Sequence, residues 1–259
     1  MARRSTLVLA GALALAAAGG SLLAGQVRGE PEPNAPKAPI PDGFTEIFNG
    51  RDTIGWHISR TNHHGTMPLF RVLDGILVGT QDPPGQGGIL LTDKKYRNVD
   101  VFMEIKPDWG CDGGLFLRSS EAGEAYQVML DYLPGGNMGG VYGERLTGVG
   151  GPPPPADMTP EQRAARAEEF RKRNEAWQKA WKREEWNTVR ARIEGDVPHI
   201  QVWINGELVT DFTDTANHAK DGATEGMIAI QMHFSNETTK RWVPGGFWRW
   251  RTIAVKELP

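Results

Sequence analysis

The chain of 259 residues has a single cysteine, Cys111, so it can form no internal disulfide and no zinc site built from cysteines. It also lacks an excess of basic residues, because 29 Lys and Arg stand against 32 Asp and Glu, for a formal net charge of −3. Binding along nucleic-acid phosphates depends on such an excess, so we expect no nucleic-acid partner. Hydrophobic residues make up 39% of the chain, which is ordinary for a folded globular protein.

Residues 1–25 are predicted to be an export signal. Arg3 and Arg4 precede an apolar run over Leu7–Ala18, and small residues follow it, which is the order of a cleaved signal peptide. The double arginine resembles a twin-arginine signal. An uncleaved anchor is the alternative, because Ser5–Ala24 approaches the ~20 apolar residues of a membrane-spanning helix. We therefore expect a periplasmic or secreted protein with no membrane contact after cleavage.

Residues 26–42 form a proline-rich linker, and the folded domain is predicted over 43–259. Prolines fix φ and remove amide donors, so the linker is an extended tether. Beyond it, apolar runs are short and are bounded by Gly, Asp, Asn or Pro, with hairpin signals at Asp74-Gly75 and Asn205-Gly206. Many short strands at this spacing predict an all-β sandwich or jelly roll.

One helical insertion, over about 157–186, interrupts the strands. Thr159 is a good N-cap, Pro160 fits the first helical position, and Gln162 completes a capping box. Three aromatic side chains recur on one face of this helix, which we expect to pack on the sandwich edge: Phe170, Trp177 and Trp181.

Strand parity predicts where the polar groups point. Side chains alternate across a strand, and each predicted strand has one aliphatic face and one face that carries polar groups. If the polar faces share a sheet, these side chains converge on one surface: Glu104, Arg118, Gln127, Asp131, Gln231 and His233. Such a surface suits a sugar, whose hydroxyls bind carboxylates, amides and guanidinium. An exposed face of an antiparallel sheet alternates in the same way and is the alternative.

Further candidates lie outside these strands. Tyr142 and Glu144 follow a glycine-rich loop and are expected at the rim of the site, whereas Trp109 and Trp203 either stack on sugar rings or fill the core. The adjacent pair His63-His64 has no partner at a metal-ligand spacing, so no metal site is predicted.

Six motifs, in order, resemble those of the 3-keto-disaccharide hydrolase domain family. They are Ile47–Asp52 with Gly55-Trp56, Phe70–Val78, Leu91-Thr92 with Tyr96 and Val101–Lys106, Gly113–Arg118, Trp186-Asn187 with Ile204–Gly206, and Ile228–His233. The resemblance runs from about Phe44 to the C-terminus, apart from the helical insertion. It implies a concanavalin A-like jelly roll that acts on glycosides oxidised at C3.

The implied chemistry begins at C2. A ketone at C3 acidifies the C2 proton, so a base can remove it, the C1 aglycone can leave, and water can then add to give net hydrolysis. From parity and motif position, His233 is expected to be the base or the acid, with Glu104 and Asp131 for the complementary proton transfer and Arg118 to stabilise the enolate or bind a hydroxyl. A structural histidine at 233 and a turn-capping role for Asp131 are the alternatives.

Two departures from the family pattern bear on activity. The family commonly has glutamate and glutamine where this chain has Gln127 and Met129, which implies an altered substrate or lost catalysis. The candidate substrate-binding residues are Arg118, Gln127, Gln231, Tyr142, Glu144, Trp109 and Trp203. The alternative function is a non-catalytic carbohydrate-binding module on the same scaffold, followed by a surface protein whose helix docks a partner. The sequence specifies no cofactor.

Overall fold

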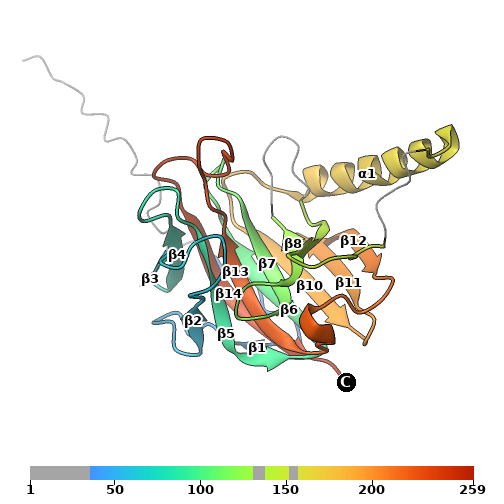
Figure 1. Ribbon diagram of the computed structural model, residues 1–259. Helices are drawn as coiled ribbons and strands as arrows, with labels where there is room; N and C mark the ends of the chain where they lie inside the picture. The colour runs from blue at the N-terminus through green and yellow to red at the C-terminus, as the bar shows by residue number, and fades with distance from the viewer. Residues whose placement is uncertain (1–35, 131–137, 152–156) are drawn as a thin grey trace, which may run out of the picture.

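Two antiparallel sheets face each other in the computed structural model, which describes residues 36–130, 138–151 and 157–259 (Figure 1). The predicted signal, Asp131 and part of the proline-rich linker lie outside the described residues. The larger sheet has the strand order β12 (Glu207–Thr213), β11 (His199–Ile204), β10 (Asn187–Glu194), β6 (Val99–Ile105), β14 (Trp248–Glu257), β4 (Ile76–Thr80) and β3 (Leu69–Leu73), with β1 (Thr45–Glu46) also paired to β14. The smaller sheet has the order β2 (Trp56–Ile58), β5 (Gly88–Tyr96), β13 (Gly226–Met232), β7 (Gly113–Ser119), β8 (Ala125–Met129) and β9 (Val141–Glu144). The prediction of an all-β sandwich is confirmed.

The hydrophobic core lies between the two sheets. Alternate residues of each strand point into it, as in β6, where Val101, Met103 and Ile105 are buried on the inner face. Leu115 and Tyr126 of the smaller sheet pack in the same core. Both predicted hairpin turns are present: Asp74 and Asn205 adopt φ of 49° and 48°, and a glycine follows each of them. These left-handed positions are what a two-residue hairpin loop requires.

The inserted helix α1 (Pro160–Ala180) projects from one end of the sandwich beside β12 (Figure 1). The predicted capping box is present, because Thr159 accepts a hydrogen bond from the Gln162 amide and the Gln162 side chain accepts one from Thr159. The helix ends six residues before the predicted boundary of 186. The reason is Asn187, whose buried side chain bonds both the amide and the carbonyl of Lys182 and fixes this segment to the sheet.

The aromatic face of α1 packs only in part. Trp177 and Trp181 lie against the core, as predicted, whereas Phe170 is 48% exposed. Among the described residues, no helix is both long enough and apolar enough to cross a lipid bilayer.

A buried carboxylate ties the β8 strand to the loops beside it. Asp214 accepts hydrogen bonds from the Tyr126 hydroxyl at 2.8 Å, the Gly150 amide at 2.9 Å and the Thr215 amide at 2.7 Å, and it contacts His218 Nδ1 at 2.9 Å. Burial alone raises the pKa of the Asp214 carboxyl, but the hydrogen bonds, His218 first, outweigh it and lower the pKa below its ordinary value.

This network predicts that the difference in stability between the wild type and an Asp214→Asn variant depends on pH. We expect Asp214→Asn to lower the free energy of unfolding by about 1–3 kcal/mol at neutral pH, because the charged carboxylate is the stronger acceptor. A lowered folded-state pKa stabilises the protein above the unfolded-state pKa, about 4, and this contribution is lost as the pH falls through the folded-state value. Urea unfolding of both proteins should therefore show a difference that shrinks below about pH 4. A pH-independent difference would contradict this account.

Candidate functional site

The outer face of the smaller sheet carries a pair of amides. Tyr126 and Val128 point into the core, so Gln127 between them points outward, where its Nε2 donates to Gln231 Oε1 on β13 at 3.1 Å. Gly114 leaves room for this pair, because a Cβ there would lie 2.5 Å from Gln127 Nε2 and 2.9 Å from Gln231 Oε1. Gln127 lines the floor of a cavity, and the fully buried Gln231 holds it from behind.

A tight turn between β2 and β3 adds two imidazoles above this floor. The buried Asn62 closes the turn, since its Oδ1 accepts from the His64 amide at 2.9 Å and its Nδ2 donates to the Gly65 carbonyl at 2.8 Å. In a strand, neighbouring side chains would point to opposite faces. The turn instead brings the rings of His63 and His64 together, with centroids 4.0 Å apart.

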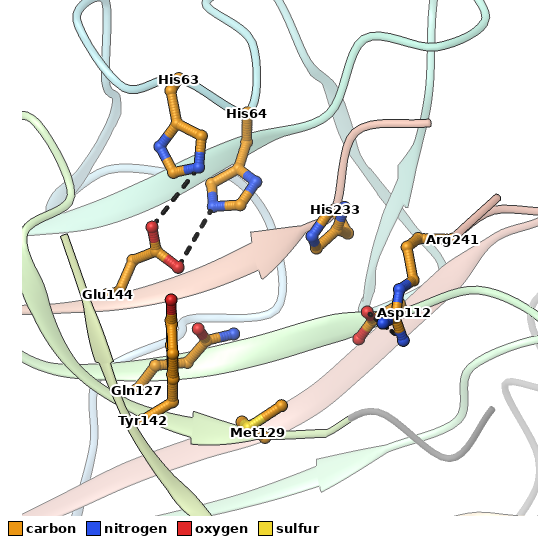
Figure 2. Close-up of a pocket in the computed structure, with 9 residues that line it drawn as sticks. All are labelled: His63, His64, Asp112, Gln127, Met129, Tyr142, Glu144, His233 and Arg241. Carbon is orange, nitrogen blue, oxygen red and sulfur yellow. Dashed lines mark ion pairs between the residues drawn. The ribbon is translucent and has the colours of Figure 1, made fainter. Parts of the chain in front are cut away.

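The cavity has a volume of about 300 Å³, near the lower end for small-molecule sites and suited to a single small ligand such as one sugar ring. Figure 2 shows the His63–His64–Glu144 group and Tyr142 on one side, with Asp112 and Arg241 on the other. Its lining residues are His63, His64, Asp112, Gln127, Met129, Tyr142, Glu144, His233 and Arg241.

Burial controls the charges on one wall. It lowers the pKa of His64 to about 2, so this imidazole is neutral at physiological pH, and it also lowers the pKa of His63. Burial raises the pKa of Glu144 to about 7, against the opposing effect of Arg145. The carboxylate oxygens of Glu144 lie 3.4 Å from His63 Nε2 and 3.9 Å from His64 Nε2.

His233 lies in the cavity just after the end of β13. Its backbone amide donates to the Asp112 carbonyl at 3.1 Å, and its carbonyl accepts from Gln81 Nε2 at 2.7 Å, so the main chain is held on both sides. The ring Nδ1 lies 2.6 Å from the Phe234 carbonyl oxygen. Since a carbonyl can only accept, Nδ1 carries the proton, and in the neutral ring Nε2 carries the lone pair.

Asp112 and Arg241 form the opposite wall. The Asp112 carboxylate is buried, and the Arg241 guanidinium lies 3.8 Å from it. A carboxylate can accept hydrogen bonds from hydroxyls and a guanidinium can donate them, so this wall can bind polar groups of a ligand.

The structure brings together five of the residues that the sequence predicts for the site. These are Gln127, Gln231, Tyr142, Glu144 and His233. Asp131 lies outside the described residues, so its placement stays a prediction.

The predicted placement of Glu104 in the site is wrong. The parity of β6 is as predicted, but β6 belongs to the larger sheet, so the polar face of this strand looks away from the cavity. There the buried Glu104 forms an ion pair with Arg251 at 3.0 Å and accepts from the Ala38 amide at 2.9 Å. The side chain holds the end of the linker against the domain.

The predicted placement of Arg118 in the site is also wrong. It has φ of 51°, and the pairing of β7 with β13 shifts register near it, which marks a β-bulge. The bulge breaks the alternation, so the guanidinium turns to the carbonyls of Gly195 and Arg97, at 2.6 and 3.3 Å. Arg118 therefore binds backbone at the edge of the sandwich and does not line the cavity.

The two tryptophans also lie elsewhere. On the larger sheet, the guanidinium of Arg190 packs over the ring of Trp203, 4.6 Å from the ring centroid. The guanidinium of Arg183 packs over the ring of Trp109 in the same way, 4.1 Å from its centroid. Neither is among the described residues that line the cavity. The hypothesis that they stack on sugar rings in this cavity is not supported.

Sequence reasoning missed His63 and His64 as site residues, together with Asp112 and Arg241. The adjacent histidines were visible, but their carboxylate partner, Glu144, comes 80 positions after His64 in the numbering. Asp112 and Arg241 lie in loops, where no periodicity reveals the direction of a side chain.

Comparison with known proteins gives the family. The sequence profile of the 3-keto-alpha-glucoside-1,2-lyase-like domain matches residues 43–256. The chain belongs to this family. The resemblance seen in the sequence motifs is therefore confirmed, and the match spans the whole sandwich. No curated protein matches the chain significantly.

Solved structures of this fold include carbohydrate-active proteins. A candidate glycosyl hydrolase from Parabacteroides distasonis ATCC 8503 has 16% identity and a TM-score of 0.50, over 83% of this chain and 99% of that chain. An endo-β-galactosidase from Clostridium perfringens that releases GlcNAcα1-4Gal has 10% identity and a TM-score of 0.50, over 85% and 64%. A β-glucanase from Bacillus licheniformis has 10% identity and a TM-score of 0.48, over 83% and 97%. The predicted concanavalin A-like jelly roll is confirmed, and at these identities the likeness concerns the fold alone.

Proposed function

We propose that this family member cleaves 3-keto-glycosides by removing the C2 proton. The observation that carries the proposal is the convergence of three imidazoles, two carboxylates and one guanidinium in one sugar-sized cavity of a 3-keto-alpha-glucoside-1,2-lyase-like domain. Such a set can move protons and bind hydroxyls at neutral pH.

The proposed reaction balances without a redox partner. A base takes the C2 proton, and the C2–H electron pair passes to the C3 ketone to form an enolate. The enolate then re-forms the ketone, its electron pair makes the C1–C2 double bond, and the C1–O bond breaks with its electrons leaving on the aglycone oxygen. That oxygen takes up a proton. Water then adds its oxygen to C1 while C2 regains a proton, so the products are a 3-keto sugar and the free aglycone.

His233 is the proposed base. Its Nδ1 proton is held by the Phe234 carbonyl, which directs the Nε2 lone pair to proton transfer. Asp131, which follows β8 in the sequence, remains the candidate acid for the leaving oxygen. Gln127 and the Asp112–Arg241 pair are assigned to substrate hydroxyls.

The enolate also needs a positively charged group near the C3 oxygen to stabilise its negative charge. Arg118 cannot supply it, because its guanidinium binds backbone carbonyls at the edge of the sandwich. Arg241 is in the cavity, but the Asp112 carboxylate already balances part of its charge.

Tyr142 lies on the rim and is 51% exposed, so we assign it to packing against the apolar face of the sugar. Tyr142→Ala is expected to raise KM about fivefold, which corresponds to a loss of about 1 kcal/mol of contact. Tyr142→Phe keeps the ring and should leave KM near the wild-type value. Steady-state kinetics would detect the difference, and equal KM values for both variants would contradict the assignment.

The direct test uses the purified protein with p-nitrophenyl 3-keto-glucoside in both anomeric forms. Release of p-nitrophenol is expected from the keto substrate and not from unoxidised p-nitrophenyl glucoside, because only the ketone acidifies C2. Saturable binding of the keto compound without release would instead indicate a carbohydrate-binding module.

We also propose that the protein acts outside the cytoplasm, on the basis of the signal-like pattern in residues 1–25. Cell fractionation should place it in the periplasm or the medium, and recovery in the cytoplasm would contradict the proposal.

A further inference from the structure

Three side chains on one wall of the cavity point donor atoms at a common space. One ligand atom from each of His63, His64 and Glu144 lies within 4.8 Å of the other two. Figure 2 shows the two imidazoles above the carboxylate, with the contacts between them drawn as dashed lines. His64 and Glu144 are buried, whereas His63 is exposed at the mouth of the group.

The imidazole nitrogens of the group lie farther from the carboxylate oxygens than a direct hydrogen bond allows. His63 and His64 lie 3.4 and 3.9 Å from the Glu144 oxygens, whereas a charge-assisted hydrogen bond spans about 2.7–2.9 Å. His57, on the surface, shows the ordinary case, with Nδ1 at 2.6 Å from Asp93 and Nε2 at 2.9 Å from Glu121. Two ligands at about 2.1 Å from a tetrahedral ion lie about 3.4 Å apart. The His63–Glu144 distance has this value, whereas His64 lies farther from Glu144, at 3.9 Å, and would have to move closer to bind the same ion.

The surroundings hold these donors in place. Asn62 fixes the turn that carries the two histidines. The Gln231 amide nitrogen lies 2.9 Å from His64 Nε2, the atom that also faces Glu144, so a metal ion bound to Nε2 would replace this contact. Phe116 and Phe234 pack beside His64, with ring centroids 6.3 and 5.9 Å away. The turn and the two aromatic rings therefore restrict the movement of the His64 imidazole.

We propose that His63, His64 and Glu144 bind one divalent transition-metal ion in the cavity. Two imidazoles and a carboxylate suit Zn²⁺, Co²⁺ or Mn²⁺, and three protein ligands leave coordination positions for a substrate oxygen. The sequence analysis predicted no metal here because the two histidines are adjacent. The turn places both rings on one side, and Glu144 supplies the missing partner from β9.

The role of the ion rests on the proposed function, although its binding does not. A cation on this wall faces the cavity and can accept the C3 carbonyl oxygen of a 3-keto sugar. It would polarise the ketone and stabilise the enolate, the task for which Arg118 is out of reach. The ring of His233, whose centroid is 5.0 Å from that of His64, is then beside the ketone, where C2 would lie.

Calorimetric titration of the EDTA-treated full chain with ZnCl₂, and separately with MnCl₂, tests the binding. We expect one equivalent to bind with at least one of the two salts. His63→Ala and Glu144→Gln should each weaken binding at least about 100-fold, because loss of even an outer-shell partner costs 10- to 100-fold. His63 is partly exposed and Glu144→Gln keeps the side-chain shape, so both variants should fold, as circular dichroism can verify.

The matched control is His57→Ala, which removes a histidine that is also flanked by two carboxylates. Its metal binding should equal that of the wild type. No binding by the wild type, or unchanged binding in His63→Ala and Glu144→Gln, would overturn the inference. Site-specific binding without turnover of a 3-keto-glucoside would support the metal site while refuting the proposed function. Turnover by metal-free protein would support the proposed function while refuting the role of the ion in it.

Discussion

His233→Gln is expected to lower kcat for a 3-keto-glucoside by at least about 100-fold, with little change in KM. A positioned general base contributes about 10²–10⁴ to the rate, and glutamine cannot accept a proton at the same place. The effect should appear in kcat because the C2 proton moves only in the chemical step, whereas hydroxyl contacts to Gln127 and Arg241 persist in the variant. Stopped-assay measurement of aglycone release over a range of substrate concentrations gives both constants.

The control for this result is His199→Gln on the larger sheet. His199 also contacts two carboxylates, Asp211 at 2.7 Å and Glu194 at 3.5 Å, but it does not line the cavity. Its substitution should leave kcat within a factor of about two. If His233→Gln keeps more than a tenth of the wild-type kcat, the histidine is structural and the base must be sought elsewhere.

Glu104→Gln is expected to destabilise the fold by about 3 kcal/mol while leaving kcat of the folded enzyme unchanged. Glu104 and Arg251 are each 2% exposed, and breaking a buried ion pair by removal of one charge costs about 3–5 kcal/mol. Arg251 also donates to the Pro36 carbonyl at 2.6 Å and lies over the Trp186 ring at 4.1 Å. Loss of the pair should therefore loosen the linker end as well.

A double-mutant cycle separates the ion pair from general damage. Arg251→Met alone should destabilise by a similar amount, and the double variant should be more stable than the sum of the two losses predicts, because both single losses include the same ion pair. Urea unfolding gives the stabilities, and aglycone release measured well below the unfolding transition gives kcat. A 100-fold fall in kcat for folded Glu104→Gln would restore its predicted role in proton transfer.

Local signals in the sequence predict much of the fold. Asp74-Gly75 and Asn205-Gly206 fix the hairpins because few residues adopt positive φ, and Thr159 with Gln162 fixes the start of α1. Alternation also places Gln127 correctly on the outer face, since the neighbouring core residues leave it only that direction.

The errors arise where alternation is not enough. Parity says which face of a strand is polar but not which sheet the strand joins. It therefore groups Glu104 with polar side chains of the smaller sheet, although its own strand lies in the larger sheet. Parity also fails across a bulge, which turns Arg118 aside. Loops have no period at all, so the directions of His63, His64 and Asp112 depend on tertiary contacts such as those of Asn62.

Deuterium incorporation at C2 tests the central claim most directly. The purified protein is incubated in D₂O with a 3-keto-glucoside, and the 3-keto sugar product is examined by NMR at early times against an enzyme-free control. Proton abstraction followed by hydration predicts a product that carries solvent deuterium at C2, formed at the rate of aglycone release. A product released at full rate with its original C2 hydrogen retained would show that the glycosidic bond is cleaved without an enolate.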